Sequence, residues 1–346
     1  MGVTKTAVLC ASAMLSLSGC GSIAGGGRVV TLADLGLADR YSGDSATAQS
    51  APAGDLAYWW RGFDDPQLDA LVQRARDADP AEAKNGKALY LAELQHIAAE
   101  AGVARSYMMV RARQAKIENL RSHIAARQDD ETIARFREEA KLVTARDALQ
   151  AAAESDRAAA AIPALEAAMA ADVARIAILT GRAPAALRKE LAPVRAIPEG
   201  PSDVAVGAPS DLLKRRPEVR LAALELARAR KWGGKGKAAL AAYKQAVLRM
   251  FEEAENAQTA FAAAKARAAA LDKAVDEAAE LALLTRKHYR EGLADYVALE
   301  NAERGLLAVR DERVDALADR ATALIDLFTA LGGGWEMEAD ADGEHL

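Results

Sequence analysis

The chain has 346 residues, of which 85 are alanine and 10 are proline, with 27% charged and 5% aromatic residues. This composition favours long helices and argues against a β-sandwich or barrel, whose strands need β-branched and aromatic residues. The formal net charge of -5, with 45 basic and 50 acidic residues interspersed, gives no support for nucleic-acid binding. We therefore expect an all-α protein that has no nucleic acid as a partner.

Residues 1–19 have the pattern of a lipoprotein signal peptide. Lys5 provides a short basic region, and the apolar stretch over 6–16 is too short to cross a membrane as a helix. Residues 17–20 (LSGC) resemble a bacterial lipobox, in which Cys20 is acylated and becomes the mature N-terminus. An ordinary secretory signal with a chance cysteine is the alternative.

Cleavage before Cys20 also removes Cys10, so the mature chain has no internal disulfide. Gly21 follows the lipobox instead of an aspartate, which in lipoprotein sorting usually means transfer to the outer membrane. No other apolar run approaches 18 residues. We expect a lipid-anchored protein of the cell outer membrane with its helical body in the periplasm.

Residues 20–54 are rich in Gly, Ser and Ala and predict a lipidated flexible tether. The following aromatic segment contains Trp59 and Trp60, which we interpret as a packing anchor. Asp64 or Asp65 before Pro66 predicts a helix N-terminus with proline in the first turn.

The rest of the chain contains the same unit twice, at an offset of about 151 residues. Each unit is a long helix, a tight turn and a second long helix. The first hairpin is expected over 90–141 and 143–180, with Pro163 as a kink or a change of packing partner. In the second, the helix over 243–291 is about 70 Å long and ends at Gly292.

Apolar residues in both hairpins recur at steps of three and four, which predicts coiled-coil seams. The expected organisation is a first hairpin repeat over 55–182, a Pro-rich connector over 183–209, a second hairpin repeat over 210–335 and an acidic disordered tail over 336–346. Hairpins of this length need each other, and other subunits, to bury their seams.

The search for chemistry finds no catalytic group, metal site or cofactor site. The four histidines are scattered and have no partners at zinc-binding spacing, and no glycine-rich loop has phosphate-binding spacing. The basic glycine-rich segment over 233–237 is explained by a bend into the next helix. We therefore expect a protein that is not an enzyme.

Seven ordered segments resemble the outer-membrane efflux lipoproteins, the NodT-like branch of the TolC-fold outer-membrane factors. They are the lipobox at Cys20, WWRGFDDPQLDALV over 59–72, IPALE over 162–166, LTGRAP over 179–184, GAPSDLLKRRPEVR over 207–220, YREGLADY over 289–296 and ALGGGW over 330–335. The resemblance implies a homotrimer whose hairpins build a periplasmic helical tunnel.

Members of this family form the exit duct of a tripartite efflux system of the RND type, with a periplasmic adaptor and an inner-membrane transporter. The resemblance therefore implies export of small molecules and drugs, with Cys20 anchored in outer-membrane lipid. It also implies that the helix–turn tips dock the adaptor, which assigns that role to the residues of the two turns, or else these are simply turn residues. The turn residues are Gly292, Leu293 and Asp295 in the second hairpin and Leu142, Val143 and Thr144 in the first, where Lys141 replaces the family's usual glycine.

The sequence departs from the family in one respect. Transmembrane strands of about 9–11 alternating residues are expected near 83–91 and 230–238, and neither window has room for them. We therefore expect the β-barrel strands to be missing or vestigial. Two hypotheses follow: a channel subunit of an efflux system, or a lipid-anchored helical scaffold without a barrel that docks the adaptor and forms no pore.

Overall fold

The computed structural model describes residues 30–41, 56–78, 86–141, 145–231 and 236–334. The elements within these ranges are helices, and none of them is a β-strand. The predicted all-α fold class is therefore confirmed. Two short 3-10 helices, η1 (Ala33–Leu35) and η2 (Trp59–Phe63), precede the α-helices.

The long helices come in two matching sets, as the repeat predicts. The first set is α2 (Pro66–Ala78), α3 (Gly86–Glu139) and α4 (Ala145–Leu179), and the second is α7 (Pro217–Lys231), α8 (Gly236–Glu291) and α9 (Tyr296–Ala330). Each helix of the second set begins 150 or 151 residues after its counterpart. The segment between the sets holds two short helices, α5 (Pro184–Glu190) and α6 (Pro209–Arg215).

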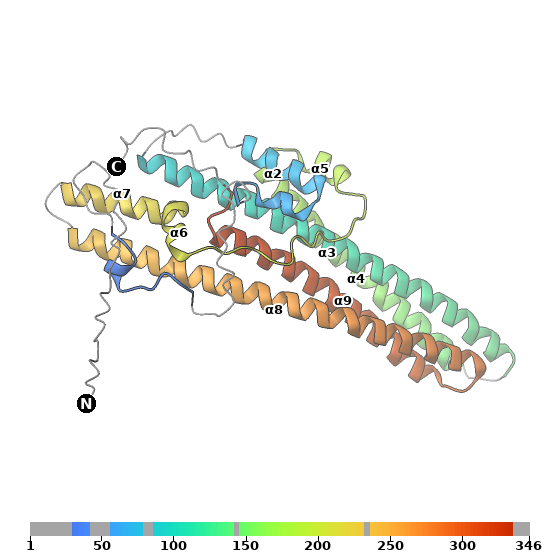
Figure 1. Ribbon diagram of the computed structural model, residues 1–346. Coiled ribbons are helices and arrows are strands. Elements are labelled where there is room, and N and C mark those ends of the chain that lie inside the picture. The colour runs from blue at the N-terminus through green and yellow to red at the C-terminus, as the bar shows by residue number, and fades with distance from the viewer. Residues whose placement is uncertain (1–29, 42–55, 79–85, 142–144, 232–235, 335–346) are drawn as a thin grey trace, which may run out of the picture.

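The four longest helices run alongside one another (Figure 1), and their contacts give an open array in the order α4, α3, α9, α8. Helix α3 packs along both α4 and α9, and α8 packs along α9. The shorter α7 lies against α8 and α3, and α2 lies against α3. With 54 and 56 residues, α3 and α8 are each about 80 Å long. Helices α4 and α8 therefore form the two long edges of the array.

Local sequence signals fix the helix ends. The Asp65 carboxylate accepts hydrogen bonds from the backbone N–H groups of Gln67 (2.8 Å) and Leu68 (3.0 Å) and so caps α2, with Pro66 in its first turn. Of the two aspartates that the sequence offers, Asp65 is the cap. Helix α4 continues through Pro163.

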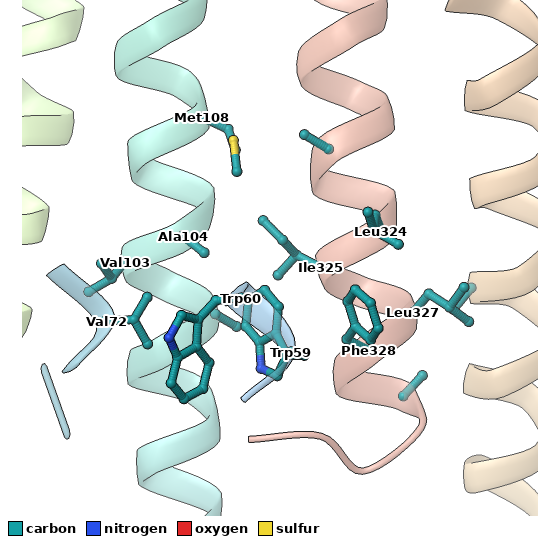
Figure 2. Packing of buried hydrophobic residues seen from close by; sticks show 14 of the residues in the cluster. Trp59, Trp60, Val72, Val103, Ala104, Met108, Leu324, Ile325, Leu327 and Phe328 are labelled. Carbon is teal, nitrogen blue, oxygen red and sulfur yellow. The ribbon is translucent and has the colours of Figure 1, made fainter. Parts of the chain in front are cut away.

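The core lies where the array meets the η2 and α2 segment (Figure 2). Trp60 is fully buried and donates its indole N–H to Asp69 at 2.8 Å. The ring of Trp59 stacks on that of Phe328 at 5.7 Å between centroids. The interpretation of the tryptophan pair as a packing anchor is confirmed.

The seams run along the array as predicted. In α8, the predicted apolar stripe has buried residues along its length: Val247, Ala254, Phe261 and Ala268. Gln258, the polar interruption of this stripe, donates its side-chain amide to the carbonyl of Ala254 at 3.1 Å.

Residues 30–41 differ from the flexible tether that the composition predicts for 20–54. Leu32 and Tyr41 are buried, and the Tyr41 ring lies 6.4 Å from that of Phe251 in α8. Tyr243 donates its hydroxyl to the carbonyl of Val30 at 3.3 Å. Apolar side chains at intervals in this segment reach the core, which a composition count does not register.

Four predicted features lie outside the described residues: the signal peptide over 1–19, Cys20, the turn over 142–144 and the tail over 336–346. The windows at 83–91 and 230–238 are described in part, and there 86–91 belongs to α3, 230–231 to α7 and 236–238 to α8. Among the described helices, none combines the length and the apolar character needed to span a bilayer.

Candidate functional site

The turn between α8 and α9 is the candidate site that lies entirely within the described residues. Helix α8 ends at Glu291, and Gly292 follows with φ 77°, in the left-handed region that favours glycine. The N–H of Leu293 donates to the carbonyl of His288 at 2.8 Å, and that of Gly292 to the carbonyl of Tyr289 at 3.1 Å. These bonds close the helix in the manner of a glycine C-cap.

Asp295 begins the next helix. Its carboxylate accepts the backbone N–H of Ala298 at 2.8 Å, which is the N-cap bond of α9. Leu293, between the two caps, is 74% exposed, and Val297 in the first turn of α9 is 48% exposed. The three sequence-predicted residues therefore lie together at one tip of the array, with an apolar side chain turned to solvent.

An aromatic cluster supports this tip from inside. Tyr289 at the end of α8 and Tyr296 at the start of α9 are buried, with ring centroids 6.0 Å apart in an edge-to-face arrangement. Leu299 and, from α3, Ile133 complete the cluster. Burial is the main cause that raises the pKa of Tyr296 to about 12.

Arg137 of α3 connects the first hairpin to the second tip. Its guanidinium donates to the carbonyl of Tyr289 at 3.0 Å and lies 4.9 Å from the centre of the Tyr289 ring. A cation at a helix C-terminus also interacts favourably with the helix dipole. In the sequence, Arg137 is a single arginine in a segment that resembles a solvent-exposed helix, so nothing there signals this role. Sequence reasoning therefore missed the contact between Arg137 and the second tip.

A shallow cavity of about 460 Å³ lies between the two hairpins at this end. Its lining includes Arg137 and Arg146 from the first hairpin and Leu293, Asp295 and Val297 from the second. The tip therefore offers both charge and apolar surface to a partner.

The first tip is described up to Lys141. This residue has φ 61°, and its N–H donates to the carbonyl of Glu138 at 2.8 Å. The lysine therefore takes the left-handed conformation that Gly292 takes in the second hairpin, at a backbone cost that glycine does not have.

A buried ionic cluster lies behind the tips, between α3, α8 and α9. Asp130 has no exposed surface and lies 3.8 Å from Arg127 and 3.6 Å from Arg286. Arg286 also pairs with Glu303 at 2.7 Å, and Arg127 donates to the carbonyl of Glu300 at 3.3 Å.

Burial raises the pKa of Asp130 to about 6, against the opposing effect of Arg286 and Arg127. The cluster thus connects both hairpins through charges that have little contact with water. Within the described residues, no group of three or more His, Cys, Asp or Glu side chains is arranged to hold a metal ion.

Comparison with known proteins places these features in context. Residues 234–333 match the family described as "Outer membrane efflux protein". The chain is 31% identical over 113 residues to outer membrane protein OprJ of Pseudomonas aeruginosa, a match that covers 33% of this chain and 22% of OprJ. The chain thus spans about a fifth of the length of this curated relative.

Solved structures share the fold over most of the chain. The outer-membrane channel OprN superposes with a TM-score of 0.73 at 20% identity, covering 86% of this chain and 99% of the other. The outer membrane protein VceC of Vibrio cholerae gives 0.58 at 18% identity, covering 86% and 85%. The resemblance to outer-membrane efflux proteins is confirmed, while the NodT-like lipoprotein branch stays a prediction.

Proposed function

We propose that the chain is the outer-membrane channel subunit of a tripartite efflux system of the RND type, exporting small molecules and drugs through a trimeric helical duct. The observation that carries this proposal is the open array α4–α3–α9–α8, in which each edge helix packs along only one of the other long helices among the described residues, α4 along α3 and α8 along α9. Three copies joined edge to edge would close such arrays into a tube.

The edge helices carry apolar side chains that a single chain leaves in water. On α8, Leu281 and Leu283 are 59% and 69% exposed, and on α4, Leu149 and Ile178 are 70% and 79% exposed. Burying one such side chain contributes about 1.5–3 kcal/mol. These residues support contact between α8 of one copy and α4 of the next.

The tips support the second part of the proposal, in which a periplasmic adaptor binds at Gly292, Leu293 and Asp295, and at Leu142, Val143 and Thr144 of the first hairpin. Leu293 is exposed beside a cavity with two arginines, a combination that suits a protein partner with apolar and acidic side chains. An inner-membrane transporter would contact this assembly through the adaptor. The lipid anchor at Cys20 would hold the assembly in the outer membrane.

Two leucine variants separate the edge from the tip. Leu283→Glu places a charge on the edge of α8, and Leu293→Glu places the same charge on the tip; both side chains are highly exposed in one chain, so both variants should fold. We expect light scattering to give three times the chain mass for the parent protein and for Leu293→Glu, and a lower mass for Leu283→Glu. A monomeric parent chain would contradict the proposal.

Single-channel recording of the purified parent protein in a planar bilayer tests conduction. Uniform steps that disappear in Leu283→Glu would support a trimeric duct. Silence from protein that is trimeric and helical would favour the alternative, a lipid-anchored scaffold that docks an adaptor without forming a pore. Photo-crosslinking from position 293 in cells, with mass spectrometry of the product, tests docking, and recovery of no periplasmic adaptor would contradict it.

A further inference from the structure

The end of the array opposite the tips brings three helix termini together (Figure 1). Helix α7 ends at Lys231, and α8 begins at Gly236 and packs against α7. The start of α3 lies beside them, because Lys87 pairs with Glu225 of α7 at 2.8 Å. Arg228 of α7 is also close to the first residue of α3: one of its side-chain nitrogens lies 3.5 Å from the position that a Cβ atom on Gly86 would occupy.

This end is strongly basic in an acidic protein. Residues 86–91, 225–231 and 236–244 contain six Lys or Arg and one acid, although the whole chain has 45 basic and 50 acidic residues. The five basic residues whose side chains are described are all exposed, and we call them the basic end: Lys87, Arg228, Arg230, Lys237 and Lys244. Among the described residues, the acids nearby are Glu225, paired with Lys87, and Asp34 of η1, so the five cations outnumber them.

Apolar surface lies among these cations. A cavity of about 350 Å³ is lined by Val30, Leu35 and Leu240 together with Asp34, Arg230 and Lys244. Leu240 is 39% exposed, and Leu91 on α3 is 44% exposed. Cations around partly exposed aliphatic side chains suit a membrane surface, where headgroup phosphates and acyl chains lie close together.

The start of the described chain lies at the same end. Val30 lines this cavity and is ten residues from Cys20. Ten extended residues reach at most roughly 35 Å. If Cys20 carries lipid, as the proposed function requires, this end is held within that distance of the bilayer, whereas the tips lie about 80 Å further along α8.

We propose that the basic end binds the headgroups of anionic phospholipid, so that the array stands on the membrane surface with its tips directed into the periplasm. The orientation rests on the proposed function, whereas lipid binding itself does not. Attraction of each Lys or Arg to an anionic surface increases affinity by about fivefold and decays within a Debye length of about 10 Å in ordinary salt.

The test uses the full chain with Cys20→Ser, so that no acyl group contributes, and measures co-sedimentation with vesicles. We expect binding to equimolar phosphatidylglycerol and phosphatidylethanolamine, weakening as salt is raised, and little binding to pure phosphatidylcholine. In this background, Lys237→Gln with Lys244→Gln should lower the affinity about 25-fold, since two cations are lost. Both lysines are exposed, so neither substitution should disturb folding, and circular dichroism verifies the helical content.

The matched control is Lys141→Gln with Lys287→Gln, which removes the same charge at the tips and should leave vesicle binding unchanged. Equal binding to neutral and anionic vesicles, an unchanged affinity of the Lys237/Lys244 variant, or an equal loss in the control would each overturn the inference. Oligomer mass and bilayer conductance are measured without these variants. The proposed function can therefore fail while lipid binding is upheld, and lipid binding can fail while the proposed function is upheld.

Discussion

Glu100 provides the sharpest test of the energetics of this fold. Its side chain is 1% exposed on α3, and it forms an ion pair with Arg76 at 3.4 Å. Among the described residues, neither carboxylate oxygen accepts a hydrogen bond. Burial raises the pKa of Glu100 from 4.5 to about 8, against the opposing effect of Arg76. The folded protein therefore binds this proton more tightly than the unfolded chain does.

The sign of the pH dependence follows from this pKa. The stabilising effect of the bound proton is fully present below pH 4.5 and is lost as the pH rises to about 8, at about 1.4 kcal/mol per pH unit. Above pH 8 the ionised carboxylate costs about 5 kcal/mol. Glu100→Gln resembles the protonated acid, so we expect it to match the parent near pH 5 and to be more stable by several kcal/mol near pH 9.

Urea unfolding followed by far-UV circular dichroism, repeated between pH 5 and pH 9, measures this difference. Glu118→Gln, which changes an exposed glutamate of the same helix, is the control and should show no such divergence. If the free energies of unfolding of Glu100→Gln and the parent run parallel over this range, the carboxylate is solvated in the folded protein and the reasoning fails.

The remaining predictions concern packing and turns, each measured as a free energy of unfolding in urea. Trp60→Ala should destabilise the protein by about 3–5 kcal/mol, because a fully buried side chain and its bond to Asp69 are lost, and a cost below about 1 kcal/mol would contradict the core assignment. Gly292→Ala should cost about 1 kcal/mol from backbone strain alone, since the nearest atom to the new Cβ is 3.8 Å away. Lys141→Gly should stabilise by up to about 1 kcal/mol, and a loss of stability would show that the lysine side chain matters more than its backbone conformation.

The sequence predicts the architecture well because the architecture depends on periodic and local signals. Alanine content, the three-four stripes and the repeat offset identify two long hairpins, and Pro66 and Gly292 mark helix ends through their own backbone preferences. These signals act within a few residues of the chain or repeat at a fixed spacing. They do not depend on which helices pack against one another.

The buried polar residues could not be predicted in this way. Helix α3 contacts α2, α4, α7 and α9, so residues on several of its faces are enclosed. Glu100, Arg111 and Asp130 therefore lie in the interior, although charged residues at helical spacing are typical of a solvated face. Arg111 shows the reason: it donates to Gln114 at 2.6 Å and to the carbonyl of Pro193 at 2.8 Å, a partner 82 residues away.

At the tip, residues with a structural role can be told apart from a residue that is free to bind a partner. Gly292 is explained entirely by the chain itself, because its φ and the hydrogen bonds around it close α8. Asp295 likewise has a structural role as the cap of α9. Leu293 has none in one chain, since it is 74% exposed and its side chain contributes almost nothing to folding. Leu293 is therefore the position at which docking and stability can be measured apart, because its side chain is exposed in one chain and lies between two helix caps that other residues form.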